Sequence, residues 1–256
     1  MQAPRFSANI GFLWKHLPFP DRLHAASAAG FDAVEFHDEA QTSDLSLICD
    51  ILAQTGLPVC GLNARMGDTV GCGALRGQED QARRDVDAAL QTAQAVGAAA
   101  VHVLAGRTGY EGDRAAYMRV LRHALESGDK MILIEPICRA AMSDYFLHDI
   151  EMAASIVQEI SHPRLKIMFD CFHIEMESGQ ASALFERHFG LVGHVQIASA
   201  PGRNEPGNND RLKPVALIKQ MQQSGYNGAF GCEYNPCSSV EAGLVWRDAF
   251  KGISHD

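Results

Sequence analysis

Four oxygen-bearing side chains stand at the ends of short apolar segments in the second half of the sequence. They are Glu135 in ILIEP, Asp170 in IMFD, Gln196 in HVQIA and Glu233 in GCEY. If these segments are neighbouring parallel strands, about 4.8 Å apart, the four groups meet at one edge of the sheet. Three carboxylates there would repel one another and resist desolvation, and a divalent cation would remove that penalty. Ligands that are all oxygen suit Mg²⁺ or Mn²⁺ better than Zn²⁺, which favours His and Cys.

Each of these four residues alone is equally well explained as a hydrogen-bonded polar group at a strand end. Their occurrence on four consecutive strands is what favours a metal site over that simpler explanation. The hypothesis therefore depends on the strands, and on the sheet that positions them.

Eight short apolar segments are the expected strands. They are rich in Ile, Val, Leu, Phe and Met, which is typical of parallel strands that are covered on both faces. They span residues 7–12, 33–37, 58–63, 99–106, 130–136, 164–170, 193–198 and 228–234. Amphipathic segments between them predict helices, several of which end at glycine. The predicted helices span residues 21–30, 78–97, 115–128, 149–160 and 214–225.

This alternation along 256 residues predicts an α/β protein with a single (β/α)8 TIM barrel that spans residues 1–256. A doubly wound open sheet is the structural alternative, but it usually carries a GxGxxG loop after its first strand, and NIGFLWKHLPF has none. The longest segments without a helical pattern, 63–79 and 198–214, each follow the carboxyl end of a strand. Barrel enzymes keep their active sites at that end.

Composition limits the expected partners and compartment. The net charge is −9, from 31 acidic and 22 basic residues without a Lys/Arg run, which argues against nucleic acid as a partner. No apolar stretch reaches the roughly 18 to 20 residues that span a bilayer, and the N-terminus lacks the pattern of a signal peptide. The seven cysteines, without a CxxC pair, indicate reduced thiols. We expect a cytoplasmic protein without membrane or nucleic-acid partners, which could form a homo-oligomer.

Several motifs resemble the hydroxypyruvate isomerase family, within the xylose isomerase-like barrel superfamily. They are ILIEPI, FDCFH, GHVQIASAPGRNEP and GCEYNP with GLVW, and the opening FSANIGFLWKHLPFPDRLHAASAAGFDAVEF and the loop GDTVGCGALRGQ are also similar. The resemblance implies a metal-dependent isomerase of aldose–ketose type in carbohydrate metabolism, acting on hydroxypyruvate, tartronate semialdehyde or a related small hydroxy-carbonyl acid or sugar. It also implies that Glu135 and Glu233 bind the metal on opposite sides of the substrate, with Asp170 and Gln196 as the other ligands.

The residues suit this chemistry. Interconversion of a ketone and its neighbouring hydroxyl removes a proton from one carbon and returns one to the next. A metal ion polarises the carbonyl and stabilises the enediolate, while a carboxylate on either face acts as base and acid. Glu135 and Glu233 are the expected catalytic pair, and their environment must tune a pKa that is ordinarily about 4.3.

Two residues near these ligands are candidate substrate contacts. His173, in FDCFH, could hold a substrate oxygen or a metal-bound water, or it could be a loop histidine bonded to backbone. Arg203, in PGRNEP, resembles the family arginine that meets the carboxylate or terminal oxygen of the substrate, and its planar fork suits a carboxylate. A salt bridge between Arg203 and Glu205 is the alternative.

Three polar residues on earlier strands could also reach the pocket. His102, which alternates with Val101 and Val103, is expected to point into the barrel, either as a substrate donor or as a hydrogen-bonded core histidine. Asn63 ends the third predicted strand and is a further candidate substrate contact. Glu35 lies near the end of the second, where it could orient a pocket residue or form a buried pair.

The chain departs from the family pattern around the substrate mouth. GNNDRLKP follows PGRNEP, HDEAQTSD replaces an aromatic loop after the second strand, and Cys138 replaces an asparagine after EPI. The ligand set is intact, so the substrate is the open question, and isomerases of four-carbon oxo-acids and ketose 3-epimerases use similar barrels. The remaining alternatives are an AP-endonuclease-like nuclease, which would need extra histidine ligands and a basic face, and a non-catalytic protein that binds sugar acids.

Overall fold

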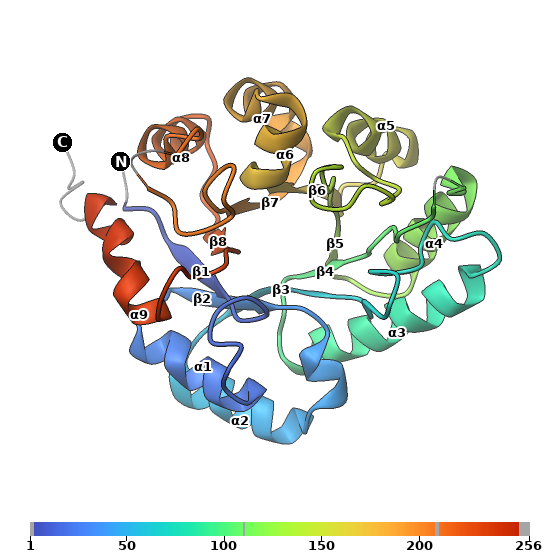
Figure 1. Ribbon diagram of the computed structural model, residues 1–256. Coiled ribbons are helices and arrows are strands. Elements are labelled where there is room, and N and C mark those ends of the chain that lie inside the picture. The colour runs from blue at the N-terminus through green and yellow to red at the C-terminus, as the bar shows by residue number, and fades with distance from the viewer. Residues whose placement is uncertain (1–2, 110, 208–209, 251–256) are drawn as a thin grey trace.

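The computed structural model of the chain describes residues 3–109, 111–207 and 210–250. Within these residues, eight parallel strands pair in chain order, and the last pairs with the first to close a barrel. Helices surround this barrel (Figure 1). The prediction of a (β/α)8 barrel is confirmed, and the open doubly wound sheet is excluded.

All eight predicted strands are found, and most are shorter than predicted. The strands are β1 (Phe6–Asn9), β2 (Ala33–Phe36), β3 (Val59–Asn63), β4 (Ala100–His102), β5 (Met131–Ile134), β6 (Leu165–Asp170), β7 (Val192–Ile197) and β8 (Phe230–Cys232).

The five predicted helices are confirmed, and four further helices occur in the described residues. The helices are α1 (Phe19–Ala28), α2 (Leu45–Thr55), α3 (Glu79–Ala95), α4 (Arg114–Glu126), α5 (Ile150–Ile160), α6 (Cys171–Ser178), α7 (Ala181–His188), α8 (Pro214–Gln223) and α9 (Val240–Gly243). The helices α2, α6, α7 and α9 were not predicted from the sequence.

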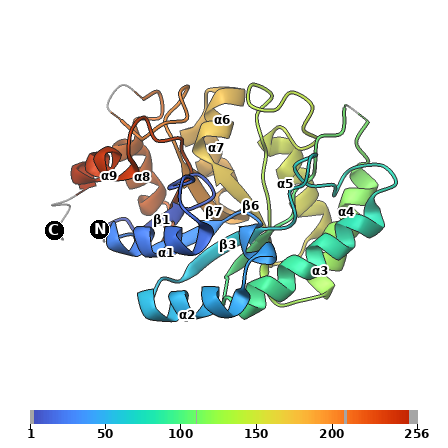
Figure 2. The ribbon, with the colours of Figure 1, turned by 60° about the horizontal axis from the view of Figure 1, so that its bottom comes forward.

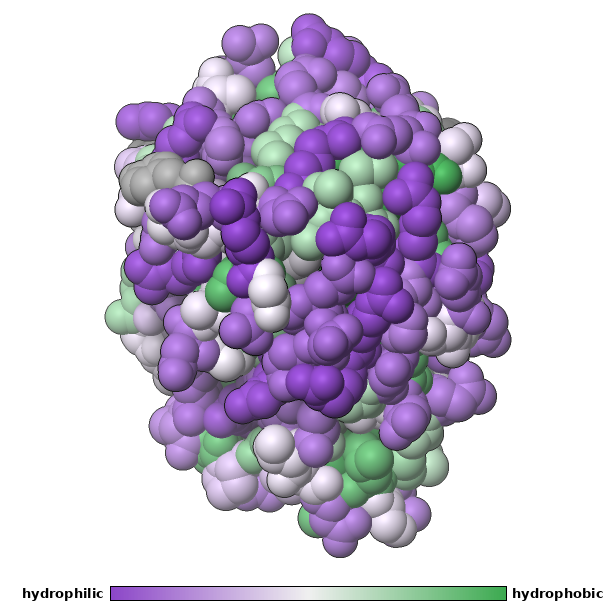
Figure 3. All heavy atoms as spheres, turned by 90° about the vertical axis from the view of Figure 1, so that its right-hand side faces the viewer, coloured by the Kyte–Doolittle hydropathy of each residue, from purple (hydrophilic) through white to green (hydrophobic). Residues whose placement is uncertain are grey.

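The apolar core lies between the strands and the helices. Alternate strand residues point outward to the helices, as where Phe169 of β6 meets Phe185 of α7 edge-on, with ring centroids 5.4 Å apart. The outer faces of the helices are solvated, and the side that carries α3 and α4 is largely hydrophilic with scattered apolar patches (Figure 3). In the part of the chain that the structure describes, no helix combines the length and hydrophobicity that crossing a bilayer requires.

Inward-pointing residues fill the barrel in two layers. Ala100, Leu133 and Met168 form a small apolar cluster inside it. Leu133 and Met168 of this cluster line a cavity of about 20 Å³ together with polar side chains that include Glu35 and Gln196. The long loops after β3, β5 and β7 all lie at the carboxyl end of the barrel strands (Figure 2). The polar layer is therefore the floor of a site at that end.

Candidate active site

The four oxygen-bearing residues lie together at the carboxyl end of the barrel. Asp170 is the last residue of β6 and pairs in register with Gln196 of β7. Glu135 and Glu233 each follow the last residue of their strands, β5 and β8. All four are buried, with exposed fractions between 0% and 7%. Side chains alternate along each strand, so apolar residues face the surrounding helices and these polar side chains face the barrel interior.

Glu233 is held by three donors. Its Oε2 accepts hydrogen bonds from Nδ2 of Asn9 at 2.8 Å and from Nε2 of Gln196 at 2.5 Å. Its Oε1 accepts from Nη2 of Arg203 at 2.6 Å, and the same nitrogen lies 3.4 Å from Oδ2 of Asp170. One guanidinium therefore bridges two of the buried carboxylates.

Arg203 reaches this position from the loop that follows β7. Its guanidinium carbon lies 4.8 Å from the ring centroid of Phe12 and 5.1 Å from that of Phe172. The alternative pairing with Glu205 is not what the structure has, because the Glu205 carboxylate accepts the backbone N–H of Cys237 instead. Burial acts to lower the pKa of Arg203, but the nearby carboxylates outweigh it and raise that pKa, so the guanidinium stays charged.

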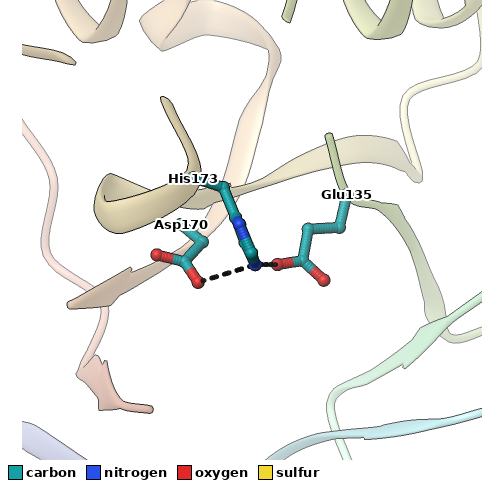
Figure 4. A group of neighbouring side chains, drawn as sticks. All are labelled: Glu135, Asp170 and His173. Atoms are coloured by element: carbon teal, nitrogen blue, oxygen red, sulfur yellow. Dashed lines mark ion pairs between the residues drawn. The ribbon is translucent and has the colours of Figure 1, made fainter. Parts of the chain in front are cut away.

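His173 lies between Glu135 and Asp170, as Figure 4 shows. Its Nε2 is 3.8 Å from Oε1 of Glu135 and 3.6 Å from Oδ2 of Asp170. One potential ligand atom from each of these three residues lies within 4.8 Å of the others. His173 belongs to the first turn of α6, which starts directly after β6, and Oδ1 of Asp170 caps that turn by accepting the N–H of Phe172 at 2.8 Å.

The residues present fit a divalent cation. Oε1 of Glu135 and Oε1 of Gln196 are buried, and neither has a hydrogen-bond partner among the described residues. Buried polar atoms in native proteins are almost always paired, so two such acceptors in one cluster need an explanation. A cation is one partner that would satisfy such acceptors, and Glu135, Asp170 and His173 form a group that could hold a metal ion.

The pKa values of the carboxyl groups show how strongly negative charge is disfavoured here. Burial, together with the charges of Glu233 and Asp170, raises the pKa of Glu135 well above its ordinary value. Burial also raises the pKa of Glu233, to about 8, although Arg203 opposes that change. Burial raises the pKa of Asp170 in the same way. A single guanidinium does not compensate three buried carboxylates, and a divalent cation would supply the missing charge.

His102 and Asn63 lie next to Glu135 inside the barrel. They pair in register on β4 and β3, and Nδ1 of His102 lies 3.1 Å from Oδ1 of Asn63 and 3.8 Å from Oε2 of Glu135. Burial lowers the pKa of His102 to about 3, so the ring is neutral. Its Nε2 is buried without a partner among the described residues, so the ring is only half satisfied as a core histidine.

Two side chains at the site, Asn9 and His194, were not predicted from the sequence, and neither was the contact that Cys138 makes. Asn9 ends β1 and donates to Glu233, and it carries the same signal as the four residues above, a polar group at the end of a buried strand. Nε2 of His194, on β7, lies 2.6 Å from Oε2 of Glu35. Sγ of Cys138 lies 3.3 Å from Nδ1 of His173, a contact between two segments that no spacing in the sequence indicates.

Comparisons with known proteins agree with the fold. Residues 23–253 match the family described as xylose isomerase-like TIM barrel. The chain is 34% identical to the 2-oxo-tetronate isomerase of Cupriavidus necator, over 97% of this chain and 99% of that protein. It is 31% identical to the hydroxypyruvate isomerase of Escherichia coli, over 96% and 99%. A crystal structure described as AP endonuclease, family 2 from Brucella melitensis superposes with a TM-score of 0.88 at 32% identity, covering 95% of this chain and 97% of that one.

The closed barrel and the acidic cluster at its carboxyl end define a xylose isomerase-like TIM barrel protein. Within that class, the chain belongs to the hydroxypyruvate isomerase family and is an isomerase. The family indicated by the sequence motifs is confirmed.

Proposed function

We propose that this isomerase uses a divalent metal ion to interconvert hydroxypyruvate and tartronate semialdehyde, or a closely related small oxo-acid pair. The observation that carries the proposal is the cluster of buried carboxylates that leaves two buried oxygens, on Glu135 and Gln196, without hydrogen bonds from the described residues. The names of the relatives from Cupriavidus necator and Escherichia coli support a small oxo-acid as substrate.

We assign Glu135, Asp170, Gln196 and Glu233 as the ligands of Mg²⁺ or Mn²⁺. Three carboxylates and an amide oxygen are a hard, oxygen-rich set, which favours these ions. When bound, the ion would supply a Lewis acid that polarises the substrate carbonyl and stabilises the enediolate.

Glu135 and Glu233 would move the protons. One carboxylate takes a proton from the carbon that carries the hydroxyl, and a carboxylic acid returns one to the neighbouring carbon. The proton of that hydroxyl passes to the former carbonyl oxygen, so that substrate and product are isomers. A general acid–base group works best when its pKa is near the working pH. In the metal-free protein burial raises the pKa of Glu233 to about 8 and that of Glu135 in the same direction. A bound cation favours the charged form and would lower both pKa values again, toward the carboxylate that acts as base.

His173, His102, Asn63 and Arg203 would bind the substrate. Burial raises the pKa of the Cys138 thiol, which therefore carries a proton that it can donate to Nδ1 of His173. Burial lowers the pKa of His173 well below its ordinary value, so its ring is neutral. The ring then keeps its proton on Nε2, where it can donate to a substrate oxygen. Arg203 stays charged at the same site and suits a substrate carboxylate.

The test is solvent deuterium incorporation, followed by NMR, with a panel of hydroxypyruvate, tartronate semialdehyde, four-carbon oxo-acids and ketoses. With Mg²⁺ or Mn²⁺ present we expect exchange and isomerisation of an oxo-acid, and loss of both with chelator or in Glu233→Gln. Glu126→Gln, which changes an exposed glutamate in the last turn of α4, is the matched control and should keep full activity. The proposal fails if no oxo-acid exchanges, or if exchange survives chelation or Glu233→Gln.

The same panel addresses two other activities. C3 epimerisation of a ketose without isomerisation of any oxo-acid would favour the epimerase alternative. A nuclease is a second candidate because the Brucella melitensis structure is described as an AP endonuclease. A fluorescent duplex that contains an abasic site tests it, and the acidic net charge of −9 leads us to expect no cleavage.

A further inference from the structure

We propose that Glu35 is a positioning residue that determines which end of the Gln196 amide faces the metal site. The inference rests on the proposed function, because it assigns Glu35 a task only if Gln196 is a metal ligand. Glu35 lies on β2, on the opposite side of the barrel from β6, and does not belong to the proposed ligand set.

The hydrogen bonds around Gln196 carry the argument. Its Nε2 lies 2.7 Å from Oε1 of Glu35 and 2.5 Å from Oε2 of Glu233. A side-chain amide has two N–H protons, so these two carboxylates use its whole donor capacity. The remaining end, Oε1, is buried and has no partner among the described residues. A turned amide would instead lose its donation to Glu35 and place its oxygen against that carboxylate, which would be repulsive.

Glu35 is fixed by contacts on its other sides. Its Oε2 lies 2.6 Å from Nε2 of His194, and its Oε1 also accepts from Nδ2 of Asn9 at 3.3 Å. Gly231 of β8 pairs in register with Gln196, and a Cβ at Gly231 would lie 2.5 and 2.6 Å from the two carboxylate oxygens of Glu35. The absence of a side chain at this strand position makes the room in which the Glu35 carboxylate sits.

The consequence concerns metal affinity. With Glu35 present, the carbonyl oxygen of Gln196 is the end that is available to a cation. Without it, Glu233 alone holds one N–H, and the amide can turn its NH₂ group toward the site, where it repels the ion. Loss of a partner that orients a metal ligand typically lowers affinity by about 10- to 100-fold.

The experiment is a double-mutant cycle on Mn²⁺ affinity, measured by calorimetry with wild type, Glu35→Leu, Gln196→Leu and the double variant. We expect Glu35→Leu to weaken Mn²⁺ binding by about 10- to 100-fold. Because Glu35 acts through Gln196, the double variant should bind Mn²⁺ as Gln196→Leu does, with no further loss. A merely structural role of Glu35 would add its full loss to that of Gln196→Leu.

Near-UV circular dichroism shows whether each variant keeps its packing. If Glu35→Leu does not fold, Glu35→Asp takes its place in the cycle, because its carboxylate keeps the charge but withdraws by one methylene from Nε2 of Gln196. Unchanged affinity in the Glu35 variant, or additive losses in the double variant, would overturn the assignment of Glu35 while leaving the proposed function intact. A wild-type protein that binds no Mn²⁺ would instead overturn the proposed function, and this inference with it.

Discussion

Metal binding should release nearly one proton from Glu233 at neutral pH. Burial raises the pKa of this residue to about 8 in the metal-free protein, so at pH 7 about 90% of the molecules carry a proton on it. A carboxylate must lose that proton before it can bind a metal ion. Glu233 should therefore release about 0.9 proton per ion at pH 7 and only about 0.1 at pH 9. Glu135, whose pKa is also raised, adds to the release in the same direction.

The same competition sets the pH dependence of the affinity. As the pH rises, fewer protons remain to be displaced and binding strengthens. With a pKa of about 8, Glu233 alone predicts that the affinity for Mn²⁺ increases about 90-fold between pH 6 and pH 9.

Isothermal titration calorimetry measures both quantities. Titrations at one pH, in buffers of different ionisation enthalpy, give the number of released protons from the slope of heat against that enthalpy. In Glu233→Gln the slope at pH 7 should fall by about 0.9, although binding is weaker overall. Heats that do not depend on the buffer, or a wild-type affinity that is constant from pH 6 to pH 9, would refute the reasoning about buried carboxyl groups.

Three further predictions follow from the same contacts. Because the pKa of Glu233 is raised, the folded, metal-free protein keeps a proton that the unfolded chain loses between about pH 5 and pH 8. The melting temperature of the metal-free protein should therefore fall as the pH rises through this range, and a rise would contradict the raised pKa of Glu233. Arg203→Lys should raise KM for the oxo-acid at least about tenfold in steady-state assays, because lysine lacks the planar fork, whereas an unchanged KM would remove Arg203 from the substrate site. Gly231→Ala should weaken Mn²⁺ binding in calorimetry as Glu35→Leu does, because the added Cβ would lie against the Glu35 carboxylate. Gly190→Ala, where an added Cβ meets nothing within 4 Å, is the control and should leave the affinity unchanged. Equal affinities in the two variants would contradict the role of the space at Gly231.

The barrel could be predicted because its strands are short, apolar and regularly spaced. The helices that were missed show where that signal weakens. The helix α6 starts at the residue after β6 and spans 8 residues, too few for a clear helical period. The helix α2 did carry recognisable ends, since Asp44 caps its first turn and Gly56 follows it with a φ of 68°. Short length therefore explains why α6 was missed, but not why α2 was, since α2 has 11 residues, as many as the predicted α5.

The cluster of polar side chains at the strand ends could be predicted because barrel closure brings strand ends together whatever the loops do. The partners of Arg203 could not, because the path of the loop after β7 carries no periodic signal. Sequence proximity suggested Glu205, whereas the guanidinium contacts carboxylates 33 and 30 residues away. The hydrogen bond between Glu35 and Gln196 joins residues 161 positions apart and depends on the register of the whole barrel.

The most direct test of the central claim is a crystal structure of the protein with Mn²⁺, using anomalous scattering to locate the ion. The account predicts a single strong site at the carboxyl end of the barrel, with side-chain oxygens of Glu135, Asp170, Gln196 and Glu233 at roughly 2.0 to 2.4 Å from the ion. An ion bound elsewhere, or an ion at this end that Gln196 and Glu233 do not contact, would contradict it.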